Sequence, residues 1–108
     1  MLESSLEVTV GGGVSFRFVV ANGGDSTVEL TFRDACKADF AVYEGSEEVW
    51  RYSDDRAFAQ MLTTAELQPG ETATFDAEWP DPNPGDYTAE ATLRVVERDV
   101  EARTPFSV

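Results

Sequence analysis

Apolar and polar residues alternate along most of the chain. In the segment 14–22, which reads VSFRFVVAN, every second residue from Val14 to Val20 is apolar, and the positions between them begin with Ser15 and Arg17. The same period of two recurs in the segments TVELTFR, TATFDAEW and YTAEATLRV. This period is typical of β-strands with one face buried and the other in water. The sequence therefore predicts antiparallel sheets that each have a wet side.

Short turn motifs separate these runs. Three glycines at 11–13, the motif NGGDS at 22–26 and the motif QPG ending at Gly70 favour turns, because glycine accepts positive φ and proline fixes φ. The three glycines lie between two expected strands and are interpreted as a hairpin turn. The segment 81–86, DPNPGD, carries two X-Pro restrictions and cannot be a strand interior. Turns about 8–12 residues apart predict an all-β Greek-key sandwich of about seven to nine strands.

The remaining segments show no sustained helical period. The stretch AFAQMLTTAEL, residues 57–67, is interpreted as an irregular connection rather than a helical turn. The last segment, 100–108, is expected to be a strand at a sheet edge, where Pro105 discourages pairing with another molecule. We expect Tyr87 to begin the longest strand and its hydroxyl to bond to nearby backbone, as in immunoglobulin-like sandwiches.

The length and composition predict one domain, residues 1–108, with its own core. The chain of 108 residues and 11.9 kDa is 42% hydrophobic, which suffices for a single core of this size. The large aromatic residues of the alternating runs are expected to form that core: Phe16, Phe18, Phe32, Trp50, Phe75, Trp79 and Tyr87. No apolar run is long enough for a membrane helix, and the first residues do not resemble a secretory signal. We therefore expect a cytoplasmic monomer.

The net charge narrows the range of partners. Asp and Glu number 21 against 8 Lys and Arg, which gives a formal charge of −13, and Lys37 is the one lysine. Such a surface repels phosphate backbones and anionic lipid, so nucleic-acid and membrane roles are not expected. A charge this large also fits a salt-rich cytoplasm, where self-repulsion is screened, so we hypothesise a halophilic source. An ordinary acidic protein is the alternative.

Residues that carry catalytic or metal chemistry are scarce. The chain has no histidine, and Cys36 is its one cysteine, so an internal disulfide is impossible and a thiol nucleophile would lack an imidazole base. No glycine pattern of a nucleotide-binding loop is present. Asp81, Asn83 and Asp86 could offer oxygen ligands to calcium, but the EF-hand spacing is missing, so a solvated turn is favoured. We expect neither an enzyme nor a metal or other cofactor.

The segment 49–62, VWRYSDDRAFAQML, concentrates aromatic and charged residues. In a strand, Arg51 and Ser53 would point to one side, while Trp50 and Tyr52 would point to the other. Trp50 would anchor the core, because an indole buries a large area. SDDR, residues 53–56, would form a turn.

Two further expectations concern the side chains around this turn. The arginines on either side are expected to form local ion pairs with Asp54 and Asp55. After the turn, Phe58 together with Met61 or Leu62 is expected to return and cover the sandwich.

These motifs resemble the BsuPI family of intracellular proteinase inhibitor domains. The resemblance rests on the segment 49–62, on LQPGETATFDAEW and GDYTAEATL downstream, and on FRFVVAN with Asn22 and VELTF upstream, so it spans about residues 6–108. One departure is Asp55, where the family pattern has a glycine, since aspartate accepts positive φ less readily. The resemblance implies an immunoglobulin-like antiparallel β-sandwich and inhibition of an intracellular serine proteinase.

Because most of the segment 49–62 is assigned to the core, a contact with a protease is expected at the turn and its flanks. The expected partner-binding residues are Arg51, Tyr52, Ser53, Asp54, Asp55, Arg56 and Phe58. Tyr52, Arg56 or Met61 would offer a side chain to the specificity pocket of the protease. The alternative is a non-inhibitory immunoglobulin-like interaction module that binds a protein partner through an edge strand or loops.

Overall fold

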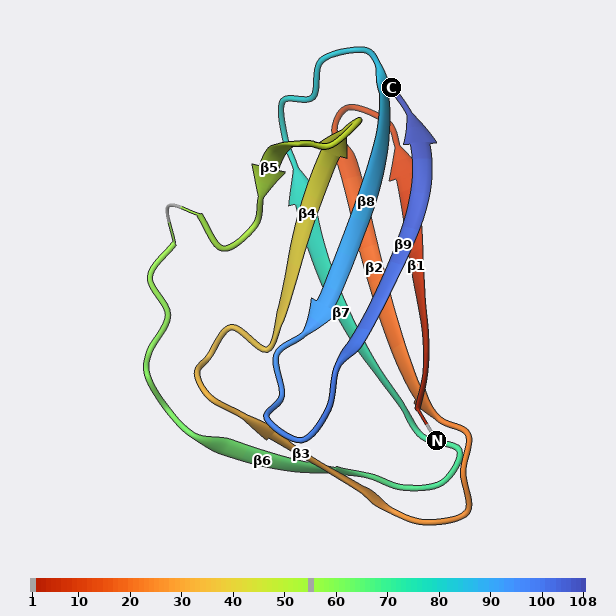
Figure 1. Ribbon diagram of the computed structural model, residues 1–108, viewed down its shortest axis with the longest axis vertical. Helices are drawn as coiled ribbons and strands as arrows, with labels where there is room; N and C mark the ends of the chain where they lie inside the picture. The colour runs from red at the N-terminus through yellow and green to blue at the C-terminus, as the bar shows by residue number, and fades with distance from the viewer. Residues whose placement is uncertain (1, 55) are drawn as a thin grey trace.

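The first sheet contains both the N-terminal strand and a strand from the second half of the chain. The computed structural model describes residues 2–54 and 56–108, which form nine strands in antiparallel sheets (Figure 1). The strands of the first sheet, in spatial order, are β1 (Leu2–Val10), β2 (Val14–Asn22) and β7 (Thr72–Trp79). The glycines at 11–13 join β1 to β2 as a hairpin, with Val10 opposite Val14. The expected hairpin turn is confirmed.

The second sheet has four strands, and a small third sheet lies at one end of the molecule. The strands of the second sheet, in spatial order, are β5 (Glu47–Arg51), β4 (Ala38–Glu44), β8 (Asp86–Leu93) and β9 (Val100–Ser107). The small sheet pairs β3 (Val28–Phe32) with β6 (Thr63–Leu67). Consecutive strands β7 and β8 belong to different sheets, as Greek-key order requires. The predicted all-β sandwich is confirmed.

Aromatic side chains join the two larger sheets. Phe16 and Phe18 point inward from β2 and lie 6.1 and 6.4 Å, centroid to centroid, from the ring of Phe40 on β4. Of the residues expected in the core, Phe16, Phe18, Phe32, Trp79 and Tyr87 are buried. Trp50 and Phe75 are half-buried and pack against that core. The apolar side chains of the alternating segments therefore point toward the opposite sheet.

Two polar side chains fix turns from inside. The Tyr87 hydroxyl donates a 2.7 Å hydrogen bond to the carbonyl of Asn83, as expected for a tyrosine at this corner. The expectation that Tyr87 begins the longest strand is wrong, because β8 has eight residues and both β1 and β2 have nine. Asn22 is 1% exposed, and its amide donates to the carbonyls of Ser26 and Leu67, both at 2.8 Å. The second of these bonds ties the end of β2 to the end of β6.

The connection between β5 and β6 is partly different from the expectation. Residues 57–62 are irregular as expected, but residues 63–67 form β6, so the irregular interpretation is wrong for that part. Only Leu67 of β6 is buried, and the strand therefore carries almost no alternation that a sequence could reveal. Pairing with β3 makes it a strand.

The two lateral sides of the sandwich differ. On one side, β1 and β9 lie next to each other (Figure 1). Ser4 on β1 donates a 2.9 Å hydrogen bond to the Glu101 carbonyl on β9. On the other side lie β5 and β7, and none of the described strands joins them. No helix in residues 2–54 and 56–108 could span a membrane.

Candidate functional site

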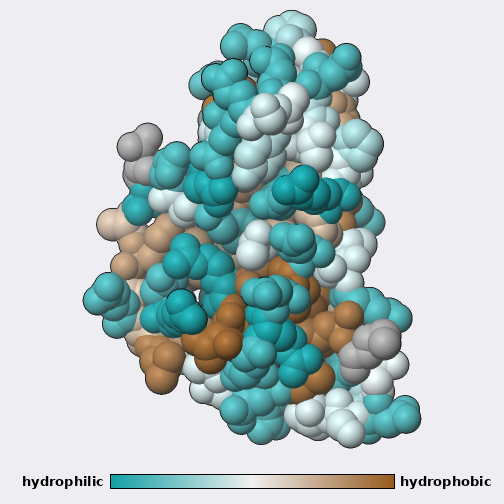
Figure 2. All heavy atoms as spheres, in the orientation of Figure 1, coloured by the Kyte–Doolittle hydropathy of each residue, from teal (hydrophilic) through white to brown (hydrophobic). Residues whose placement is uncertain are grey.

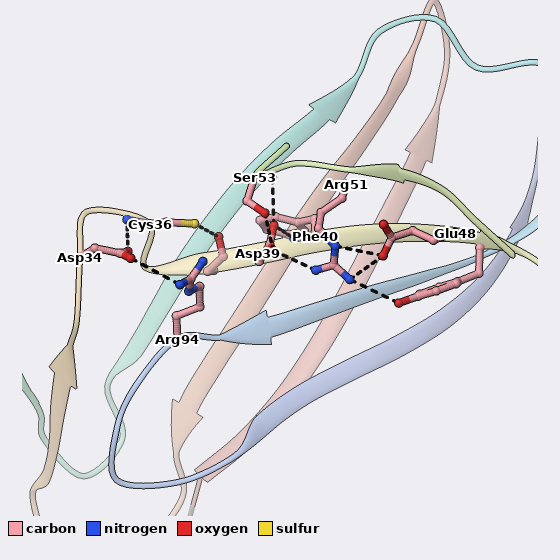
Figure 3. Close-up of polar contacts among 10 residues, drawn as sticks. Asp34, Cys36, Asp39, Phe40, Glu48, Arg51, Ser53 and Arg94 are labelled. Carbon is pink, nitrogen blue, oxygen red and sulfur yellow. Dashed lines mark hydrogen bonds and ion pairs between the residues drawn. The ribbon is translucent and has the colours of Figure 1, made fainter. Parts of the chain in front are cut away.

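A buried carboxylate organises the turn that follows β5. Asp39 on β4 is 7% exposed and accepts hydrogen bonds from the Arg51 guanidinium at 2.9 Å and from the Ser53 hydroxyl at 2.7 Å (Figure 3). It also accepts the backbone N–H groups of Ser53 and Phe40, at 3.1 and 2.9 Å. The antiparallel pairing of β4 with β5 sets Ala41 opposite Arg51 and so brings these groups together.

Arg51 has a second acidic partner. Glu48, three residues earlier, accepts from its Nε and Nη2 atoms at 3.0 and 2.6 Å. The pKa of Arg51 is raised above its ordinary value. The hydrogen bond to Glu48 is the largest cause of this increase, and the hydrogen bond to Asp39 and the negative charge of Asp39 add to it. Arg51 bonds to these two carboxylates rather than to Asp54, so the expected ion pair across the turn is wrong. Asp55, the other expected partner, lies outside the described residues.

Tyr52 is enclosed by other aromatic rings. Its ring lies 5.9 Å from that of Phe40, 6.5 Å from that of Trp50 and 6.3 Å from that of Phe58. The guanidinium of Arg56 stands 4.3 Å above the same ring, as a cation–π pair rather than an ion pair with Asp54. Tyr52 and Arg56 therefore contact each other, while Arg56 remains exposed to solvent.

The loop from β5 to β6 is attached to the sandwich before its most exposed residues. The Phe58 ring packs on Tyr52, and the Ala59 carbonyl accepts a 3.0 Å hydrogen bond from the Ala35 amide. Beyond this attachment, Met61 is 55% exposed and Leu62 is 70% exposed. The expectation that Met61 or Leu62 covers the sandwich is wrong, because Phe58 alone makes that contact. Figure 2 shows hydrophobic surface at the left of the lower half, where Figure 1 shows this loop.

Two hollows flank Tyr52. One, of about 210 Å3, lies between the loop, the start of β4 and β7; its lining includes Cys36, Tyr52, Phe58 and Phe75. The other, of about 310 Å3, is lined by Trp50, Arg51, Tyr52, Asp54, Arg56, Glu78 and Pro80.

Burial raises the pKa of the Cys36 thiol, which donates a 3.4 Å hydrogen bond to the Ala38 carbonyl. The thiol therefore stays protonated near neutral pH, which does not suit a nucleophile.

The structure brings most of the expected contact residues together. Ser53 and Asp54 form a turn in which the Asp54 amide donates to the Arg51 carbonyl at 3.2 Å. Sequence reasoning missed Asp39, the acceptor on which the turn depends. The one signal for it was an acid within the apolar run ADFAVYE.

The loop weighed as a calcium site makes internal bonds instead. The Asn83 carbonyl accepts from Tyr87, and the Asp86 carboxylate accepts a 2.6 Å bond from the Ser107 hydroxyl. In the described part of the chain, no three acidic or cysteine side chains gather in a way that could hold a metal ion.

Solved structures similar to this chain define its class as a β-sandwich. The CARDB domain of a Pyrococcus furiosus protein, in complex with di-metal ions, is 18% identical, with a TM-score of 0.53 over 100% of this chain and 92% of that one. A penta-heme cytochrome c552 from Thermochromatium tepidum is 12% identical, with a TM-score of 0.58; the match covers 97% of this chain and 39% of the cytochrome. A β-glucosidase from Erythrobacter marinus is 13% identical, with a TM-score of 0.52 over 99% of this chain and 15% of the enzyme. Identities this low concern the fold alone.

The family model gives a narrower assignment. Residues 2–98 match the BsuPI model, described as intracellular proteinase inhibitor. The chain belongs to the BsuPI family. A comparison with the curated proteins gave no match.

Proposed function

We propose that the protein inhibits an intracellular serine proteinase of the subtilisin type by binding it through the loop between β5 and β6. Membership of the BsuPI family supports an inhibitory role. The observation that favours this loop is its combination of attachment and exposure: Ala59 is hydrogen-bonded to Ala35, whereas Met61 and Leu62 are largely in solvent.

Attachment matters because a preordered loop loses less conformational entropy when it docks. The chain has one cysteine, so no internal disulfide can rigidify the loop. Two sets of contacts take that role: the bonds of Ser53 to Asp39 and the packing of Phe58 on Tyr52. In this proposal the turn residues 51–54 support the loop, and Met61 or Leu62 supplies the side chain that enters the specificity pocket.

Charge limits where affinity can originate. At −13 the protein is repelled by any acidic protease at low salt, and the repulsion weakens as salt shortens the range of electrostatic forces. Apolar contacts of Met61 and Leu62 are not weakened by salt. We therefore expect inhibition to become stronger, or at least not weaker, as the salt concentration rises.

Titration of a subtilisin-type protease with the protein tests this function. We expect stoichiometric loss of protease activity while the chain stays intact. Leu62→Ser should raise the inhibition constant about tenfold, because it removes a large apolar contact. The matched control is Val96→Ser, which alters another exposed apolar residue, 46% exposed, on the loop between β8 and β9. Unaltered protease activity, or digestion of the chain as a substrate, would overturn the proposal.

A non-inhibitory interaction module is the second candidate. It is favoured by the internal engagement of the expected contact residues, since Arg51, Ser53 and Tyr52 all have partners within the domain. Such residues stabilise a fold without requiring a protease. This candidate would be supported if the chain left the protease active and still bound another protein.

The acidic surface suggests the cellular setting. We propose a monomer in a salt-rich cytoplasm, where screening reduces the repulsion among 21 acidic side chains. The melting temperature should then rise markedly between low and molar salt. Equal melting temperatures at both salt levels would remove the halophilic hypothesis.

A further inference from the structure

The outer edge of β7 is unlike the other strand edges of the larger sheets. Strand β7 pairs with β2 over eight consecutive positions, from Thr72 to Trp79, without a register shift. No described strand pairs with its other edge. Backbone N–H and C=O groups along such an edge are ready to pair with another extended chain.

The other outer edges carry features that discourage such pairing. Strand β5 has five residues, and its pairing with β4 is interrupted by a register shift between Val42 and Tyr43. Strand β9 contains Pro105 and lies beside β1. Strand β7, with the sequence TATFDAEW, contains no proline, no lysine and no bulge. Natural edge strands are normally protected by one of these features.

A hollow lies beside this edge, on its inward side. Phe75 of β7 lines it together with Phe58 and Tyr52, and its volume is about 210 Å3. A strand added to β7 would lie about 4.8 Å away and would point every second side chain toward the inner layer. An apolar side chain opposite Phe75 would therefore enter the hollow.

Charge distinguishes between possible occupants. Asp76 and Glu78 are exposed on the outward face of β7, and the chain as a whole carries −13. Asp76 also forms an exposed 3.2 Å ion pair with Arg17 of β2. In a second copy paired through β7, two such acidic strands would lie against each other, and like charges across a strand pair are destabilising. A segment with basic side chains at the outward positions would instead form favourable cross-strand pairs.

We propose that the β7 edge binds an extended segment of another protein in which basic residues alternate with apolar residues. The segment adds a strand to the first sheet. Its basic side chains lie opposite Asp76 and Glu78, and an apolar side chain occupies the hollow beside Phe75. This surface differs from the loop at Met61 and Leu62 proposed to contact a protease.

The test uses an eight-residue capped peptide in which arginine alternates with valine and leucine. Its binding to the isotope-labelled protein is followed by amide NMR shifts and by fluorescence anisotropy of a labelled form. We expect the largest shifts in β7, with slower amide exchange at alternate residues of that strand. Glu78→Lys should weaken binding about tenfold, because it replaces an attractive cross-strand pair by a repulsive one.

Three comparisons separate strand pairing from general attraction of a basic peptide. Glu101→Lys makes the same charge change at an exposed position on β9 and should alter the affinity less than Glu78→Lys. A peptide methylated at every backbone nitrogen keeps its charge but cannot donate backbone hydrogen bonds, and it should not bind. Leu62→Ser should bind the peptide normally. Equal weakening by the two lysine variants, tight binding of the methylated peptide, or shifts confined to other strands would overturn the proposal.

Discussion

The two lateral sides of this sandwich are closed by different means. Strands β1 and β9 lie side by side, and a hydrogen bond from Ser4 to Glu101 joins them. Between β5 and β7 there is no strand contact of this kind among the described residues. Aromatic side chains bridge part of the gap, and two hollows remain beside Tyr52. Trp50 lies 5.8 Å from the ring of Phe16 and 6.3 Å from that of Trp79, so its indole connects β5 to the first sheet.

This difference explains why both proposed contact surfaces lie on one side. Strand β6 pairs with β3 at the end of the molecule and so does not cover the free edge of β7. The loop from β5 must therefore cross the side between β5 and β7, here called the open side. Phe58 and Ala59 hold the loop near the sandwich there. The β1–β9 side leaves no comparable edge or loop for a partner.

Removing the indole should have the largest effect on stability. Trp50→Ala should lower the free energy of unfolding by about 3 kcal/mol, because truncation of a large aromatic leaves a cavity against Phe16 and Trp79. Urea unfolding followed by circular dichroism measures the change. Phe106→Ala is the matched change on the β1–β9 side; its ring contacts Phe16 and Tyr87, and β9 keeps eight paired residues with β8. An equal or larger loss in Phe106→Ala would contradict the view that aromatic packing holds the open side.

The buried carboxylate should have the next largest effect. Asp39→Asn should cost about 2 kcal/mol, because the groups donated by Arg51 and Ser53 lose a charged acceptor. The Ser53 amide should also exchange faster with solvent. Asp76→Asn removes the partner of Arg17 in an ion pair whose side chains are 60% and 61% exposed, and should cost less than about 0.5 kcal/mol. Equal costs would show that Asp39 acts as an ordinary surface acid.

The alternating strands and the side of each strand that faces the core were predictable from sequence, but two strands, β4 and β6, were harder to find. In β4, the positions Ala38 to Val42 are all buried on both faces, so the period of two disappears. Strand β6 lacks an apolar face and exists through its pairing with β3. An alternation of apolar and polar residues identifies only those strands that have one buried face and one face in water.

The candidate site was predictable in its location but not in its contacts. Arg51 and Ser53 lie 12 and 14 residues from Asp39, and only the β4–β5 hairpin brings them together. Sequence proximity suggested Asp54 as the partner of Arg51. Hydrogen bonding to a buried acceptor is stronger than pairing at an exposed turn, so the distant partner is preferred.

The reactivity of Cys36 measures how far the open side admits solvent. Its thiol is buried beside the hollow and its pKa is raised, so at pH 8 a thiol reagent should react more slowly with the folded protein than with the chain in urea. Phe58→Ala should speed the reaction several-fold, because Phe58 forms part of the wall of the hollow. Val96→Ala, on the loop between β8 and β9, should leave the rate unchanged. Identical rates in all three proteins would mean that Phe58 does not limit access.

The smallest effect concerns the loop that leads into β9. Glu97 accepts hydrogen bonds from the Thr31 hydroxyl and backbone amide, which lower the pKa of Glu97 below its ordinary value of 4.5. Because the folded pKa is the lower one, this carboxylate stabilises the fold above pH 4.5, and the contribution is lost as the pH falls through the folded pKa. The stability difference between the wild type and Glu97→Gln should therefore be constant at neutral pH and should shrink below pH 4.5. Urea unfolding at several pH values measures it, with Glu101→Gln as the control, and a difference unchanged down to the acid limit of folding would rule out this role of the Thr31 bonds.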